Sequence, residues 1–139
     1  MSISFRLEMD SQLKRMLKDF PAEARRKVKG AIIETALTEV ETPAKQNCRV
    51  DTGRLRSSIH TKYSNVNANY KSRDEQGNQY DDTIPDKPKD TNNEYTVIVG
   101  TNVEYAKKIE SKDHMLENAF VNSQSKLKNA IIEAIRGIT

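Results

Sequence analysis

A ten-residue string in the first half of the chain, Val50-Asp51-Thr52-Gly53-Arg54-Leu55-Arg56-Ser57-Ser58-Ile59, constrains the fold most strongly. Asp51, Thr52 and Gly53 combine short polar side chains that hydrogen-bond the local backbone with a residue free to adopt a positive φ. This turn motif separates a segment of helical periodicity from one of alternating polarity. We therefore expect a helix to end here, the chain to reverse, and a strand to begin near Leu55.

The segment before the turn motif predicts one long helix from about Pro21 to Ala44. Pro21 suits the first turn of a helix, whereas Pro43 is expected to disturb the last one. Apolar side chains recur along this segment at helical spacing and would cover a broad face. They are Val28, Ile32, Ile33, Ala36, Leu37 and Val40.

The charges of this helix oppose its dipole. Arg25, Arg26 and Lys29 lie near its positive end, and Glu39 and Glu41 lie near its negative end. Solvated surface is the simpler explanation. The alternative is a head-to-tail contact, in which the basic end of one subunit meets the acidic end of the next. These five residues are therefore candidates for a subunit interface.

The remaining periodic segments complete an α+β domain. Alternating polarity predicts strands over residues 3–9, 55–63 and 94–100, and helical spacing predicts helices over 11–20, from about 104, and from 113 to about 136. The expected helix caps are Asp10 or Ser11, the Thr101–Glu104 capping box, and Asp113. We predict a single domain, residues 1–139, in which the long central helix and the C-terminal helix pack on a small antiparallel sheet.

Residues 64–93 form a polar stretch with scarcely an apolar side chain. A connection of this length is uncommon in a compact domain and is usually mobile or functional. We expect an extended, mobile loop between the middle strands that becomes ordered against a partner. Tyr70 and Tyr80 are its candidate anchors and interface residues.

Composition excludes several classes of protein. The chain has 139 residues and a net charge of +3, which is too even to indicate a nucleic-acid binder. Cys48 is the only cysteine and His60 and His114 are the only histidines, so we expect no disulfide, metal site or cofactor. No apolar run reaches membrane-spanning length, and we expect the protein to be made in a reducing cytoplasm.

Asp-Thr-Gly is also the triplet that carries the catalytic carboxylate of aspartic proteases, so a dimeric, retroviral-type protease using Asp51 is the alternative function. Such an enzyme needs two carboxylates that share one proton. The residues before Asp51 are polar and end a helix, whereas the protease motif leaves an apolar strand. Arg54, next to Gly53, would also favour a charged Asp51 and oppose proton sharing. We therefore favour a structural role for Asp51 and predict no catalytic residues.

A second string, Val97-Ile98-Val99-Gly100-Thr101-Asn102-Val103-Glu104-Tyr105-Ala106-Lys107-Lys108-Ile109-Glu110, completes a pair of motifs. Together with the string at 50–59, it resembles the tail-completion, or head–tail connector, proteins of long-tailed phages and prophages. The resemblance covers residues from about 21 to 120. It departs after Glu110, where many members have Gly-Thr and a Pro-Phe-Leu segment and this chain has Ser111 to Leu116.

The resemblance implies a non-enzymatic virion protein that is assembled in the host cytoplasm and joins the tail to the neck at the head–tail junction. It implies a ring, often six-fold, although a monomeric free subunit is compatible with the sequence. The implied partners are further copies of the chain, a tail-tube or tail-terminator protein, and neck or connector proteins. No membrane or specific nucleic acid is implied, and genome DNA would pass through the ring.

Overall fold

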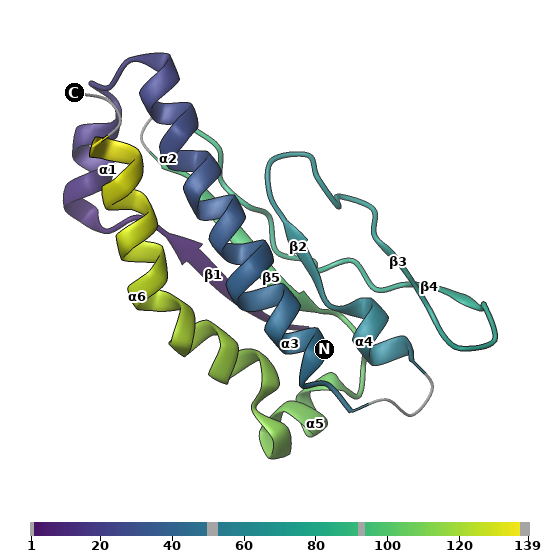
Figure 1. Cartoon of the computed structure of the whole chain (residues 1–139). Coiled ribbons are helices and arrows are strands. Elements are labelled where there is room, and N and C mark those ends of the chain that lie inside the picture. Colours follow the sequence, from purple (N-terminus) through teal and green to yellow (C-terminus); the bar gives the residue numbers. More distant parts are fainter. Residues whose placement is uncertain (1, 50–52, 92–93, 137–139) are drawn as a thin grey trace.

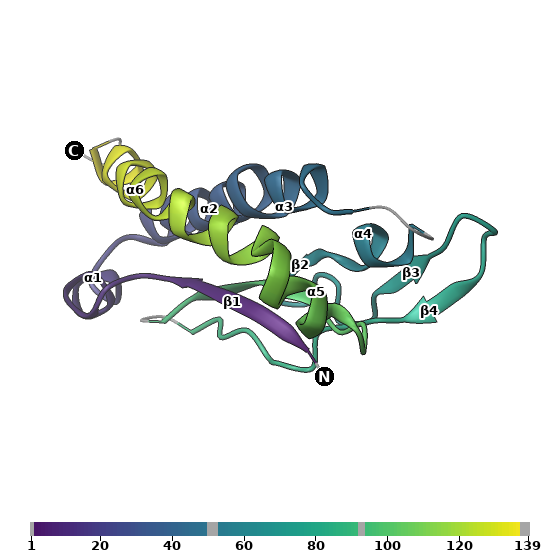
Figure 2. The same ribbon diagram turned by 90° about the horizontal axis from the view of Figure 1, so that it is seen from below.

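The structure is a computed structural model of the chain, and it describes residues 2–49, 53–91 and 94–136. Two long helices run side by side over one face of a small sheet, and a two-stranded hairpin projects from one side of this body (Figures 1 and 2). The predicted α+β class, the antiparallel sheet, the central helix and the C-terminal helix are all confirmed.

The central helix is continuous from residue 22 to residue 46. It comprises α2 (Ala22–Thr35), a wider π-helical segment η1 (Ala36–Glu41), and α3 (Thr42–Gln46). At the end of η1, both the N–H and the hydroxyl of Thr42 donate to the carbonyl of Leu37. Pro43 lacks an N–H, and in a regular α-helix its ring would collide with the carbonyl of Glu39. The wider turn just before Pro43 accommodates it without ending the helix.

The C-terminal helix α6 (Met115–Arg136) packs along α2 and η1. Its buried side chains recur every three or four residues, as the sequence predicted, and α2 contributes a matching stripe. The stripe comprises Leu116, Ala119, Ser123, Leu127 and Ile131 on α6, and Ala24, Val28, Ile32 and Thr35 on α2. Before these helices, α1 (Ser11–Leu17) begins as predicted, with Asp10 accepting a hydrogen bond from the N–H of Leu13.

The sheet has the order β1–β5–β2, with β1 (Ile3–Glu8) and β2 (His60–Lys62) both antiparallel to the central β5 (Thr96–Thr101). Every residue of β5 is buried, because the strand is covered on both faces. Gly100 permits this packing, since a Cβ at that position would lie 2.7 Å from the Cα of Ser4 on β1.

The face of the sheet away from the helices is covered by the chain that returns to β5. Ile84 lies in this segment and is fully buried. Its carbonyl accepts a hydrogen bond from the Lys62 ammonium at 2.7 Å, and Asp86 accepts one from the Ser4 hydroxyl at 2.9 Å. Part of the segment expected to be an extended loop is therefore a structural layer of the domain.

The rest of that segment contains the projecting hairpin, β3 (Lys71–Arg73) and β4 (Gln79–Asp81). Asp74 organises its turn by accepting hydrogen bonds from the N–H groups of Gln76 and Asn78 and from the hydroxyl of Tyr80. A long polar connection between the middle strands is thus confirmed. It is folded where the sequence predicted an extended path, because short polar side chains bond the turn internally.

The strand predicted over residues 55–63 is wrong in its first half. Residues Arg54–Ser58 form the short helix α4, and only β2 is extended. Gly53 has a φ of +84° and its carbonyl accepts from the N–H of Ser57, which starts the helical turn. So short a segment also fits a helical turn. Leu55 and Ser58 are three residues apart, so they lie on the same side of that turn, and both are buried.

Two predicted helix caps are also wrong. Thr101 is the buried last residue of β5, and the short helix α5 (Ala106–Asp113) begins only at Ala106, so Thr101 and Glu104 form no capping box. Asp113 lies at the end of α5 and pairs with Arg49 at 2.6 Å instead of capping α6. Thr101 does not cap a helix because it ends a strand, and Asp113 does not cap α6 because it forms an ion pair with Arg49.

Candidate functional site

The two motif strings contact each other at Arg54, and we therefore take this region as the candidate functional site. Arg54 opens α4, and its guanidinium donates to both oxygens of Asp82, at 2.9 and 3.2 Å. The same guanidinium donates to both oxygens of Glu104, at 3.1 and 3.2 Å. Asp82 is almost fully buried, whereas Glu104 lies at the surface. One cation therefore joins the first motif, the second motif and the base of the hairpin.

Aromatic rings enclose this cation. The Arg54 guanidinium lies 3.9 Å from the ring centroid of Tyr80 on β4 and 5.9 Å from that of Tyr105. The hydrogen bonds to Asp82 raise the pKa of Arg54 still further above its usual value, so the side chain stays charged. The pKa of Glu104 is lowered, first by the backbone N–H of Glu104 itself and then by Arg54. The cluster is a fixed joint in which one guanidinium bridges two carboxylates.

A second link between the motifs lies beneath this joint. The hydroxyls of Ser58 and Thr101 are 2.6 Å apart, and neither residue is exposed. The Ser58 hydroxyl also bonds the carbonyl of Leu55, and the Thr101 hydroxyl accepts from the N–H of Val103 at 3.2 Å. Buried hydroxyls satisfied in this way fix the relative position of α4 and β5.

The hairpin is fastened to the body through Ser72, Tyr70 and the buried carboxylate of Asp82. Ser72 on β3 donates a hydrogen bond to Asp82, and both residues are buried. The Tyr70 hydroxyl donates to the carbonyl of Ser57 at 2.6 Å, and its ring stacks on His60 at a centroid distance of 4.1 Å. Burial raises the pKa of the Tyr70 hydroxyl. These contacts hold the base of the hairpin against α4.

His60 is a structural residue of this region. The N–H of Ile84 donates to its Nε2 at 3.2 Å, so Nδ1 carries the proton and donates to the carbonyl of Ser58 at 2.8 Å. Burial lowers the pKa of His60 to about 4. The Ser58 hydroxyl bonds Leu55 and Thr101, and both ring nitrogens of His60 bond main-chain groups. His60 therefore does not activate Ser58 as a nucleophile.

Asp51 and Thr52 of the turn motif lie outside the described residues, and Gly53 adopts the left-handed conformation expected of it. The helix α3 leads into the motif, and the helix α4 leaves it. An aspartic-protease triplet sits at the end of a strand. The elements on either side of this triplet therefore argue for the structural role and against the protease alternative.

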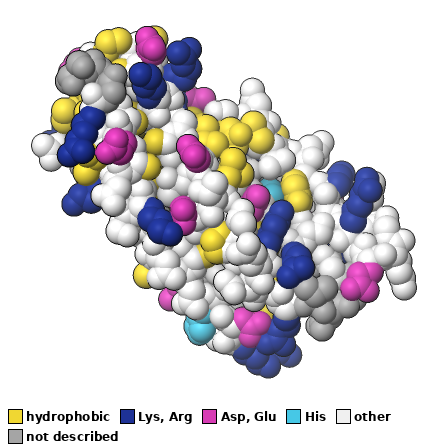
Figure 3. Space-filling model, viewed as in Figure 1, with side chains coloured by type: hydrophobic (Ala, Val, Ile, Leu, Met, Phe, Trp, Pro, Cys, Tyr) yellow, Lys and Arg dark blue, Asp and Glu magenta, His cyan; other side chains and the backbone are white. Residues whose placement is uncertain are grey.

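The predicted interface residues are distributed over the body and the hairpin. Lys29 pairs with Asp90 at 2.8 Å, Glu39 pairs with Lys126 at 2.8 Å, and Glu41 accepts from the Thr61 hydroxyl at 3.1 Å. Arg25 donates to the carbonyl of Phe20, Arg26 is exposed, and Tyr70 and Tyr80 lie in the hairpin joint. Acidic and basic side chains are interspersed over the face formed by the two long helices (Figure 3). Their role in an interface stays a prediction.

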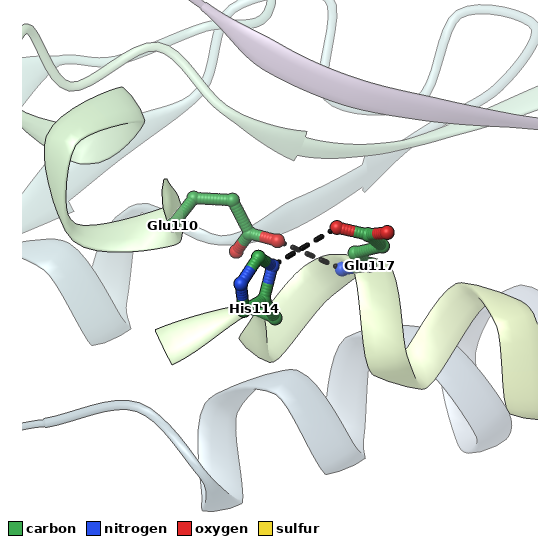
Figure 4. A group of neighbouring side chains, drawn as sticks. All are labelled: Glu110, His114 and Glu117. Carbon is green, nitrogen blue, oxygen red and sulfur yellow. Dashed lines mark hydrogen bonds and ion pairs between the residues drawn. The ribbon is translucent and has the colours of Figure 1, made fainter. Parts of the chain in front are cut away.

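One group of side chains missed by the sequence argument has the geometry of possible metal ligands. The ligand atoms of Glu110, His114 and Glu117 lie within 4.8 Å of one another (Figure 4). The buried Glu110 already accepts from the N–H groups of Leu116 and Glu117, at 3.0 and 2.9 Å, and His114 Nδ1 lies 3.0 Å from Glu117. We interpret the group as the cap of α6, since a carboxylate is favoured and a cation disfavoured at the start of a helix.

No helix within residues 2–49, 53–91 and 94–136 is long and apolar enough to cross a membrane. No curated protein and no solved structure matches the chain. A family model described as "Bacteriophage HK97-gp10, putative tail-component" matches residues 8–111, which is well over half of the chain. This span contains both motif strings and the hairpin between them, and it confirms the predicted resemblance to tail-completion proteins. The chain therefore belongs to the HK97-gp10-like family of phage tail components.

Proposed function

We propose that this tail component acts without catalysis at the head–tail junction, where a ring of copies completes the tail and joins it to neck or connector proteins. The observation that carries the proposal is the hairpin. It projects from the compact body (Figure 2), and its base is held by the bidentate pair between Arg54 and Asp82. A rigidly mounted projection loses little conformational entropy when it binds a neighbour.

The two motif strings support a mounting role for this region. They are separated by a long connection in the chain, and the contacts of Arg54 with Glu104 and of Ser58 with Thr101 bring them together at the root of the hairpin. Residues of the two motif strings thus position a projection, as expected for an assembly protein. Genome DNA would pass through the ring without sequence-specific contacts, in keeping with the net charge of only +3.

The test shortens the hairpin without disturbing its base. Residues 73–79 are replaced by Asn-Gly, which supports a two-residue hairpin turn between Ser72 and Tyr80, because the alternation of the ladder makes these two residues a hydrogen-bonded pair. A larger deletion would be uninformative, because Ile84 and Asp82 are buried parts of the domain. We expect a folded subunit, together with separate heads and tails in an infected culture and a loss of infectious particles.

The matched control replaces only Gln76, an exposed turn residue, with Ala. This variant should fold and complement a phage that lacks the gene. Electron microscopy of lysates would separate the outcomes. Normal yields of joined, infectious particles with the shortened hairpin would refute its role in head–tail joining.

A further inference from the structure

The geometry points to a head-to-tail contact between copies of this chain, in which the outer edge of β4 from one copy adds to the free edge of β1 in the next. This inference rests on the proposed ring and specifies how neighbouring copies bind. It uses two sheet edges that the fold leaves open on opposite sides of the molecule (Figures 1 and 2).

The first open edge belongs to β1. The N–H of Thr96 donates to the carbonyl of Lys89 at 3.0 Å, so the pair Glu8–Thr96 is not hydrogen-bonded within the sheet. Antiparallel ladders alternate, and Ser4, Arg6 and Glu8 therefore direct their main-chain N–H and C=O groups away from β5. Among the described residues, no strand or loop pairs with these groups, and Arg6 and Glu8 are exposed.

The opposite edge of the same sheet is closed. Thr61 is the residue of β2 whose main chain faces outward, and its carbonyl accepts a hydrogen bond from the Asn67 side chain at 2.7 Å. All three residues of β2 are buried. Within the described chain, β1 therefore provides the accessible edge of the three-stranded sheet.

The second open edge belongs to the hairpin. The N–H of Arg73 on β3 donates to the Ser57 hydroxyl at 2.9 Å, so this strand faces α4 and its pair with Gln79 is not hydrogen-bonded. By the same alternation, Gln79 and Asp81 direct their main-chain groups to the outer side of β4. Both residues are exposed, and no described strand lies beyond them.

A second copy fits these edges better than an unrelated strand does. Because the edges lie on opposite sides of the molecule, each copy can offer its hairpin to one neighbour and its β1 to another, which is a heterologous contact that closes into a ring when the rotation permits. Antiparallel addition with Arg6 opposite Asp81 places charges of opposite sign side by side. Charged edge residues discourage indiscriminate strand pairing, so this complementarity also selects the partner.

The β1 edge also leads to an apolar surface that a docked copy would cover. A groove of about 350 Å³ runs between α1 and α6 and begins at Glu8, where the edge ends. Met16 and Ile132 are exposed in it. A short strand pairing contributes little by itself, and burial of such apolar area supplies the missing stabilisation.

Two proline substitutions test the inference, since each removes one outward N–H that the isolated fold does not use. Arg6→Pro blocks the β1 edge and Gln79→Pro blocks the hairpin edge, with Arg6→Ala and Gln79→Ala as controls that keep the N–H. Sedimentation velocity of each protein up to its highest soluble concentration measures association, and far-UV circular dichroism checks folding.

We expect the wild type to associate with increasing concentration, the alanine controls to associate as well, and each proline variant to remain monomeric. An equimolar mixture of the two proline variants retains one intact pair of edges and should give dimers and nothing larger. If Gln79→Pro alone forms the wild-type species, the head-to-tail contact is wrong while the proposed ring survives. If the wild type stays monomeric throughout, edge addition does not drive association and the inference is refuted. The shortened-hairpin experiment then still tests the function independently.

Discussion

At the scale of single residues, Arg54 is the most heavily used side chain of the motif region. Its guanidinium forms hydrogen bonds with the buried Asp82 and the surface Glu104, and it also lies over the ring of Tyr80. A bidentate pair of this kind has fixed geometry, which a lysine cannot reproduce. In the sequence, Arg54 stands out only as an obstacle to protease chemistry, because both carboxylates that it binds are far from it in the chain.

Replacing Arg54 with Ala should lower the free energy of unfolding by about 3 kcal/mol, because it leaves the buried Asp82 carboxylate without its charged partner. Urea denaturation followed by circular dichroism measures the loss. The control is Arg26→Ala, an exposed arginine of α2, whose effect should stay within about 0.5 kcal/mol. An Arg54→Ala protein as stable as the control would show that the joint contributes little to folding.

His60 makes the stability of the fold dependent on pH. Its pKa is about 4 in the folded chain and 6.5 when unfolded, so the unfolded chain binds the proton first as the pH falls. Stability should be fully present above pH 6.5 and fall progressively between pH 6.5 and pH 4. The total loss is roughly 3 kcal/mol, from 2.5 pKa units.

Urea titrations at several pH values would measure this loss, with His60→Gln as the comparison. The variant keeps an acceptor for the N–H of Ile84 but does not titrate. Between pH 6.5 and pH 5, where most carboxylates stay charged, the wild type should lose stability and the variant should not. Equal slopes for the two proteins in this range would contradict the assignment of a neutral, buried His60.

At the scale of secondary-structure elements, β5 is the element on which the others depend. It pairs with both neighbouring strands and is covered by helices on one face and by the segment around Ile84 on the other. Its sequence predicted a strand correctly, since both of its faces are rich in β-formers. The burial of both faces depends on the long polar connection folding back over the sheet.

Gly100→Ala should destabilise the protein by about 2 kcal/mol, because the new Cβ would force β1 away from β5. Gly30→Ala is the matched comparison in α2, where nothing lies within 4 Å of the added Cβ. That substitution should raise stability by about 0.5–1 kcal/mol through better helix propensity. Thermal unfolding of both variants should show a lower melting temperature for Gly100→Ala and a higher one for Gly30→Ala. A stabilising Gly100→Ala would contradict the close approach of β1 to β5.

At the scale of the whole molecule, a three-layer body carries a short projecting hairpin. The helices α2 and α6 form one layer, the sheet forms the second, and the segment from Asp82 to Asp90 forms the third (Figure 2). This arrangement leaves a β edge on one side and the hairpin on the other. Both proposals above follow from that asymmetry, because a protein built this way can contact two different neighbours.

The sequence alone determined the α+β class, the two long helices, the central strand and the family. These features follow from periodicity and from two motif strings, which are local properties of the chain. The functional role expected of residues 64–93 and of Tyr70 and Tyr80 stays a prediction. The sequence did not predict the helical start of the segment after Gly53 or the capping of α6 by Glu110.

Only the tertiary structure decided which residues share a site. Arg54, Asp82 and Glu104 are far apart in the chain, and no local pattern predicts that one guanidinium binds both carboxylates. The same is true of Ile84 beneath the sheet and of the open edges of β1 and β4. Local propensity assigns helices and strands, whereas long-range packing and ion pairing decide how those elements meet.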